Sequence, residues 1–198
     1  METGAQPVRE SIEFARIVAF TDGVFAIAIT LLVLSLDVPS NLSGSALHDF
    51  LIDSWPQLFA YFLSFAVIGR FWIGHHRFFS RVETFDRRLL VLNLTYLSLV
   101  VLVPFPTELL GEYGGRSDAV ALYALVVGSA ALLAWVMLRY AVHRGHARPR
   151  PRPATGLVVG GPLIPALIFY ASIPVAFASP LLAQLMWIAL LVDVFRRG

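Results

Sequence analysis

Long apolar stretches alternate with short polar connections along this chain. A helix rises about 1.5 Å per residue, so about 20 apolar residues cross a hydrocarbon core of roughly 30 Å. The pattern therefore predicts an all-α, polytopic membrane protein with six transmembrane helices in a single domain over residues 1–198. The predicted spans are residues 17–36, 55–73, 89–110, 119–140, 156–177 and 180–195.

The first stretch differs from the others because it begins with polar residues. It reads RIVAFTDG from Arg16 to Gly23 and continues as VFAIAITLLVLSL to Leu36. An aspartate within a membrane helix is costly, by about 2.5–3.5 kcal/mol on insertion scales. Asp22 therefore indicates that this helix does more than anchor the chain.

Composition supports the membrane assignment and excludes several chemistries. The chain is 58% hydrophobic and 14% charged, whereas soluble domains have about 45–50% apolar and about 25% charged residues. Cysteine is absent from the sequence, which excludes disulfides, thiolate metal sites and a cysteine nucleophile. Three glutamates precede the first apolar stretch, so no basic signal peptide is expected there.

The arginines set the expected orientation. All 15 basic residues are arginine. All but Arg116, which lies in the third connection, gather before the first stretch, after the sixth, and in or next to the second and fourth connections. The positive-inside rule places these segments and both termini in the cytoplasm. The same placement explains the net charge of +2 without a nucleic-acid partner. Anionic lipid headgroups are a candidate partner for the fourth connection, where His143 and His146 are expected to be solvated.

One face of the first predicted helix is a stripe of branched apolar side chains. At about 100° per residue, Ile27, Leu31 and Leu34 lie on one side with Thr30 at the edge, and Asp22 points away. Several copies around an axis would bring these stripes together as a hydrophobic constriction that gates ions by dewetting. Ordinary helix packing would give the same periodicity and remains the alternative.

Other polar residues favour structural roles. The adjacent residues His75 and His76 point about 100° apart on a helix and are a poor pair for one metal ion, so we predict structural or pH-sensing histidines and no metal or cofactor. Ser64 in the second predicted helix and Asn93, Thr95 and Ser98 in the third are expected to make interhelical hydrogen bonds. Because no catalytic set of residues is evident, the sequence does not predict an enzyme.

The first predicted helix and the end of the second resemble the transmembrane protein 175 family, whose members are potassium-permeable channels found in lysosomes and many bacteria. Arg16, Phe20, Thr21 and Asp22 are similar to its Arg-x-x-x-Phe-Ser-Asp signature, with threonine in place of serine. The segment Phe71–Phe79, FWIGHHRFF, is similar to its stretch with tryptophan and histidine at the end of the second helix.

The resemblance implies a homotetrameric channel in a bacterial inner membrane, with the first helix of each chain lining the pore. Ile27, Leu31 and Leu34 would form its hydrophobic layers, Ile27 the narrowest, and Thr30 would contribute to cation selectivity. Potassium would be the permeant ion. The sequence agrees in having no TVGYG-like segment for a carbonyl filter.

The signature residues Arg16, Thr21 and Asp22 are then best interpreted as a scaffold. A buried carboxylate needs donors or a cation, and Asp22 is expected to find them in Trp72, His75 or His76, or in an arginine. Two alternatives remain open. Asp22 could carry protons in a proton-coupled secondary transporter, or the two histidines could serve a membrane-embedded enzyme.

Overall fold

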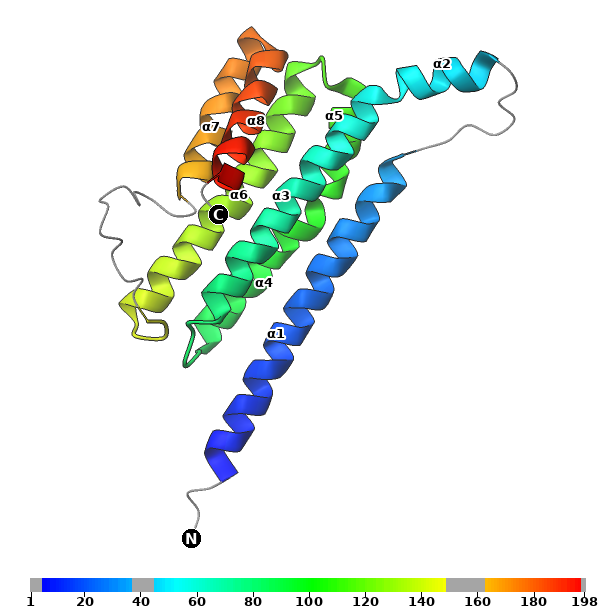
Figure 1. Cartoon of the computed structure of the whole chain (residues 1–198). Helices are drawn as coiled ribbons and strands as arrows, with labels where there is room; N and C mark the ends of the chain where they lie inside the picture. Colours follow the sequence, from blue (N-terminus) through cyan, green and yellow to red (C-terminus); the bar gives the residue numbers. More distant parts are fainter. Residues whose placement is uncertain (1–4, 37–44, 149–162, 197–198) are drawn as a thin grey trace.

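The protein is helical through nearly all the residues that its structure, a computed structural model, describes: 5–36, 45–148 and 163–196 (Figure 1). These residues form no β-strand, and their β-type pairing is a single isolated bridge between Val82 and Ala147. The helices are α1 (Ala5–Leu31), continued by the 3₁₀ turn η1 (Leu32–Ser35), α2 (Ser45–Asp53), α3 (Trp55–Phe79), α4 (Arg87–Leu102), α5 (Pro104–Tyr113), α6 (Ser117–His143), α7 (Leu163–Ala178) and α8 (Pro180–Arg196).

Among the described residues, four helical segments are long and apolar enough to cross a membrane. They are Ile12–Ser35, Trp55–Phe79, Arg87–Tyr113 and Ser117–His143, and they contain most of the first four predicted spans. The fifth and sixth predicted spans correspond to the shorter apolar helices α7 and α8. Residues 156–162 of the fifth span lie outside the described residues. The short helix α2 was not predicted.

The third predicted span is broken into two helices, which corrects the expectation of one continuous helix. Pro104 has no N–H, and a proline ring also clashes with the carbonyl four residues earlier. The backbone N–H of Val103 accordingly bonds to the carbonyl of Val100 at 3.2 Å, three residues back rather than four. The chain then resumes as α5, which packs against α3 and α6.

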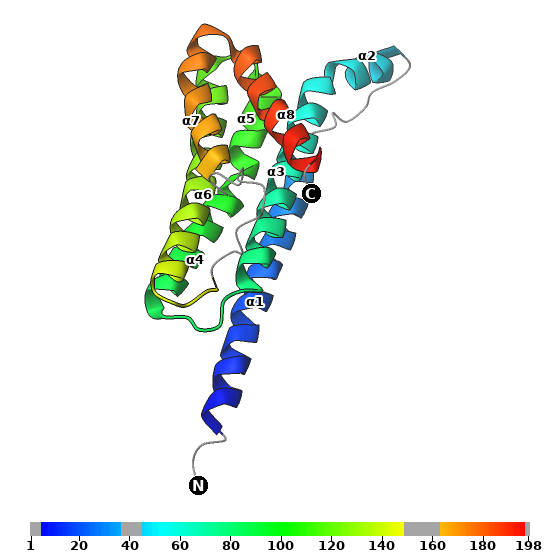
Figure 2. The same ribbon diagram turned by 60° about the vertical axis from the view of Figure 1, so that its left-hand side comes forward.

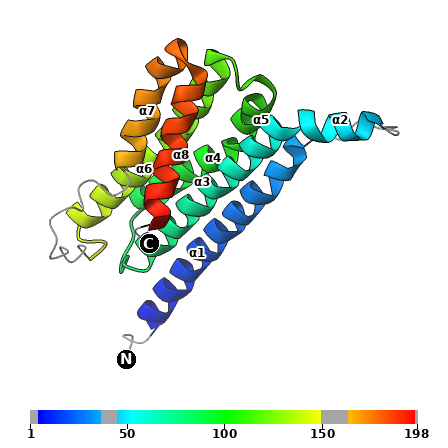
Figure 3. The same ribbon diagram turned by 45° about the horizontal axis from the view of Figure 1, so that its top comes forward.

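Helix α6 lies at the centre of the helix bundle, and α1 lies at its edge. α6 contacts α4, α5 and α7, and its residues Val120, Tyr123 and Val127 are fully buried. α7 and α8 form a hairpin against α6, as the views in Figures 2 and 3 show. α1 lies along one side of the bundle, in contact with α3 and α4. One long face of α1 is therefore left without a neighbour in the described chain.

Candidate functional site

One face of α1 attaches this helix to the bundle. Thr21, Phe25, Ala28 and Leu32 are each no more than 1% exposed. Their spacing of four, three and four residues keeps them on one side of a helix. This face meets α3 and α4, and Thr21 is the polar residue among its four buried side chains.

The predicted stripe of apolar side chains lies on the outer face of α1. Ile27 is 57% exposed, Leu31 is 37% exposed and Leu34 is 74% exposed. Thr30 is exposed beside them, and its hydroxyl donates to the carbonyl of Ile27 at 2.9 Å. A branched apolar surface of this size on a single chain is typical of a face that contacts lipid or another protein chain.

Asp22 joins α1 to α3 through a side-chain hydrogen bond. The indole Nε1 of Trp72 donates to Oδ1 of Asp22 at 2.9 Å. The Trp72 ring in turn lies 5.8 Å from the ring of His76, which is exposed. The structure thus brings three of the predicted residues together, although Asp22 and His76 do not bond to each other directly in the described chain.

A second, buried chain of hydrogen bonds lies beside the first. The Nδ2 amide of Asn93 on α4 donates to Oγ1 of Thr21 at 3.2 Å. The other amide atom of Asn93, Oδ1, lies 2.8 Å from Nε2 of His75. Because a carbonyl oxygen only accepts, Nε2 carries the hydrogen in this arrangement. Thr21, Asn93 and His75 therefore connect α1, α4 and α3 in one network, which we call the buried triad.

Aromatic rings enclose His75 of the buried triad. Its ring stacks on Tyr96 at 5.6 Å between centroids with 5° between the planes, and on Phe79 at 4.5 Å. Phe25 of α1 lies 5.6 Å away on another side. His75 is 6% exposed. This packing holds the imidazole in one orientation and excludes water from its bond to Asn93.

Arg16 and Phe20 do not join either network within the described chain. Both are exposed on α1, where they line a shallow hollow against α4 together with Glu13 and Asn93. His75 and His76 point in different directions, one buried and the other exposed. Among the described residues, no group of three or more histidines and acids comes together that could hold a metal ion.

The role of Asn93 is what sequence reasoning missed. It was expected to make an interhelical hydrogen bond, and it does, but nothing identified it as the link between Thr21 and His75. The available signal was a lone amide in the apolar run LVLNLTYL. Ser64 also bonds between helices as expected, to the hydroxyls of Tyr123 at 3.0 Å and Thr107 at 2.8 Å. The same expectation is wrong for Thr95 and Ser98, whose exposed hydroxyls donate to carbonyls of their own helix, at Val91 and Thr95 respectively.

The arginine-rich end of the bundle is closed by a polar clasp that the sequence analysis did not predict. His146, expected to be solvated, lies with its Nε2 3.4 Å from Asp86 and its Nδ1 3.0 Å from the hydroxyl of Thr84. The hydroxyl of Tyr140 donates to Asp86 at 2.5 Å. Arg148 forms an ion pair with Glu83. The α3–α4 and α6–α7 connections are thereby tied together.

The clasp stabilises the ionised form of Asp86. The Tyr140 hydroxyl, and after it the backbone N–H of Leu89 at the start of α4, lower the pKa of this carboxyl group to about 2. Asp86 is also the N-cap of α4. Its carboxylate therefore accepts a hydrogen bond from the otherwise free N–H of Leu89. Its negative charge also interacts favourably with the positive N-terminal end of the helix dipole.

Comparison with known proteins shows which proteins this chain is similar to. The sequence profile described as the endosomal/lysosomal potassium channel TMEM175 matches residues 16–104. A potassium channel of Streptomyces collinus is 44% identical over 139 residues, 68% of this chain and 67% of that protein. A potassium channel of Chamaesiphon minutus is 48% identical over 106 residues, so the match spans about half of each protein, 52% of both.

The fold is similar to that of a solved channel. The crystal structure of a lysosomal potassium-selective channel TMEM175 homolog from Chamaesiphon minutus superposes with a TM-score of 0.81. That alignment is 32% identical and covers 93% of this chain and 97% of the other. The structural likeness extends well beyond residues 16–104, the segment matched by the sequence profile.

Proposed function

This chain belongs to the TMEM175 family, whose members are ion channels rather than enzymes, and we propose that it forms a potassium-permeable cation channel from four copies. The first helix of each copy lines a single pore. Both termini face the cytoplasm of a bacterium whose inner membrane holds the channel. The observation that carries the proposal is the apolar outer face of α1, which is exposed in the single chain.

The exposed stripe supplies the constriction. Ile27 on α1 and Leu34 on η1 are more than half exposed in the single chain. Both lie in the segment Ile12–Ser35, which is long and apolar enough to span a membrane. Around a fourfold axis such side chains form rings that exclude water, so an ion must lose hydration to pass. Ile27 forms the narrowest ring, with Leu31 and Leu34 as the further layers.

Thr30 supplies the polar contribution to selectivity. Its hydroxyl donates to the backbone of its own helix, which leaves the oxygen lone pairs available on the exposed face. An oxygen ligand in an otherwise apolar pore favours a cation that sheds its water at low cost. Selectivity then needs no ring of backbone carbonyls of the usual potassium-channel type.

Asp22 and the buried triad act as scaffold for the pore helix. The Asp22 carboxylate is bonded to Trp72 and does not lie on the stripe of Ile27 and Leu34. Arg16 and Phe20, within two turns before Asp22 on α1, are exposed in the single chain and are available for contacts between copies. We therefore expect Asp22→Ala to reduce assembly or expression rather than to change ion preference in a normally assembled channel.

The decisive experiment is potassium flux through purified protein in liposomes, with sodium as the comparison ion. Ile27→Asn places an amide in the proposed constriction, and we expect flux to rise severalfold because the dewetting barrier falls. Ile164→Asn on α7 is the matched control, since Ile164 is 41% exposed on a helix away from α1. It is expected to leave flux unchanged.

A different result would favour the carrier alternative. Flux that saturates with ion concentration, is indifferent to position 27 and disappears in Asp22→Asn would identify Asp22 as the transported-proton site. A channel instead predicts that the wild-type current persists whenever Asp22→Asn assembles.

A further inference from the structure

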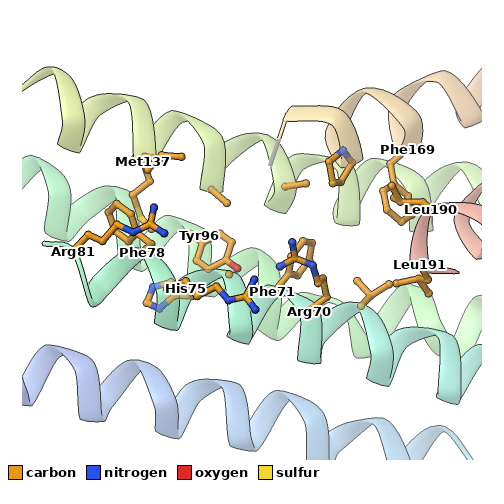
Figure 4. A pocket seen from close by; sticks show the side chains of 17 residues that line it. Arg70, Phe71, His75, Phe78, Arg81, Tyr96, Met137, Phe169, Leu190 and Leu191 are labelled. Atoms are coloured by element: carbon orange, nitrogen blue, oxygen red, sulfur yellow. The ribbon is translucent and has the colours of Figure 1, made fainter. Parts of the chain in front are cut away.

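A cavity lies between α3 and α6 on the side of the bundle away from α1. Its volume is about 190 Å³, and Figure 4 shows it between the two helices, with α7 and α8 at one end. Much of the wall is apolar and aromatic, including Phe71, Tyr96, Met137, Phe169 and Leu190.

The cavity lies beside a section of α6 that the described part of α7 does not cover. α6 has 27 residues and extends about 40 Å, whereas α7 has 16 residues and extends about 24 Å. α7 begins at Leu163, so its described part covers only the section of α6 that is distant from the clasp (Figure 1). Pro165 near the start of α7 and Leu191 on α8 border the cavity at the level where this cover ends.

Arginines line the cavity on the α3 side. Arg70, Arg77 and Arg81 are spaced by seven and four residues, which places them on one side of α3 and its following turn. Figure 4 shows Arg70 and Arg81 extending from that side into the space between α3 and α6. None of the described residues that line the cavity is acidic.

Two of these arginines are available to a ligand. The structure gives Arg77 and Arg81 no ion pair with a carboxylate among the described residues. Arg81 is partly buried, so its charge is partly removed from water. Arg70 has an interaction of its own and is not one of these two.

We propose that this cavity binds one anionic phospholipid, with its phosphate between Arg77 and Arg81 and an acyl chain along the apolar wall. Guanidinium groups bind phosphate oxygens through paired, charge-assisted hydrogen bonds. The adjoining wall of Phe71, Phe169 and Leu190 accommodates hydrocarbon but offers nothing to a soluble anion. The expected orientation makes this a lipid of the cytoplasmic leaflet.

The bound lipid would lie next to His75, a member of the buried triad that holds the proposed pore helix α1. His75 and Tyr96 both line the cavity, and their rings stack on each other. His75 also bonds to Asn93, which bonds to Thr21 on α1. An effect of bound lipid on conduction rests on the proposed function, whereas lipid binding itself does not.

The test is native mass spectrometry of the purified full-length protein titrated with phosphatidylglycerol or with phosphatidylcholine of the same acyl chains. We expect the wild type to retain phosphatidylglycerol preferentially. Removing both charges in Arg77→Gln/Arg81→Gln should weaken that binding by about 30-fold, from roughly 1 kcal/mol per arginine. The matched control is Arg87→Gln/Arg88→Gln, which removes two exposed charges at the same end of the bundle but outside the cavity.

A third variant tests the apolar part. Ala134→Phe narrows the cavity without changing charge and should also weaken phosphatidylglycerol binding. Inorganic phosphate that competed as well as the lipid would show a simple anion site and overturn the proposal. So would equal losses in the two double variants, which would indicate general attraction to the basic surface. Arg77→Lys/Arg81→Lys should recover part of the affinity and shows whether the glutamine variant is merely misfolded.

Discussion

Single polar residues in apolar helices decide how α1 is held. Thr21, Asn93 and His75 are each at most 6% exposed, and each finds its partner on another helix. A buried polar group without a partner is costly, by about 1–3 kcal/mol. The register of α1 against α3 and α4 is therefore fixed more sharply than apolar contacts alone would fix it.

Asn93→Leu should destabilise the protein by about 1–2 kcal/mol, because it leaves the Thr21 hydroxyl and the His75 N–H unpaired. Thermal unfolding of the purified protein in detergent measures the change. Thr95→Val on the same helix is the control, since Thr95 is exposed and donates only to its own backbone at Val91. Equal shifts in the two variants would contradict a role for the buried triad.

The clasp at Asp86 predicts a pH dependence of stability. The folded-state pKa of Asp86 is lowered to about 2 from 3.8, so its contribution is complete above pH about 3.8 and is lost as the pH falls toward 2. Tyr140→Phe removes the largest cause of this shift. We expect the variant to lose less stability than the wild type between pH 4 and pH 2.

Melting temperatures of the two proteins across that pH range measure the effect. Tyr113→Phe removes an exposed hydroxyl outside the clasp and should follow the wild type. If Tyr140→Phe also follows the wild-type curve, the Tyr140–Asp86 bond does not contribute to stability in solution.

At the scale of elements, the break at Pro104 allows α5 to approach α3 closely. A Cβ added at Gly111 would lie 3.1 Å from the backbone Cα of Gln57 on α3. Gly111→Ala should therefore separate the two helices. Overpacking costs about 1–3 kcal/mol, and the gain in helix propensity is about 1 kcal/mol. We expect the cost to outweigh the gain because the nearest atom belongs to the backbone of α3, which cannot rotate aside as a side chain can.

Unfolding of Gly111→Ala should thus occur at lower temperature than that of the wild type. Gly69→Ala on α3 is the matched control, because nothing lies within 4 Å of its added Cβ. It should be neutral or stabilising. A stable Gly111→Ala protein would mean that α5 can move away from α3 without loss.

At the scale of the whole molecule, the exposed stripe of α1 predicts where copies meet. The sequence has no cysteine, so single cysteines can be introduced without background. Leu34→Cys should form oxidative cross-links between copies in membranes, because fourfold symmetry brings position 34 of each chain to the same level near the axis. Leu182→Cys on α8, also exposed, should not.

Gel electrophoresis after mild oxidation gives the result directly. Cross-linked dimers at position 34 alone would support α1 as the central helix. Cross-links at position 182 alone would place α8 at the interface and would remove the basis for an α1-lined pore.

The sequence by itself determined the helical class, the extents of the main apolar segments and the two-faced character of α1. These features depend on the identity and spacing of neighbouring residues, and helical periodicity converts spacing into a face without reference to the rest of the chain. The signature at Arg16–Asp22 likewise indicated the family from residues close together in the chain.

Only the tertiary structure decided which polar groups meet. Sequence spacing could offer Trp72, His75 and His76 as partners of Asp22, and the packing of α1 on α3 selected Trp72. The buried triad, the clasp and the arginine-lined cavity each join segments far apart in the chain. Their geometry depends on the rotation and relative height of packed helices, which the periodicity of a single helix does not specify.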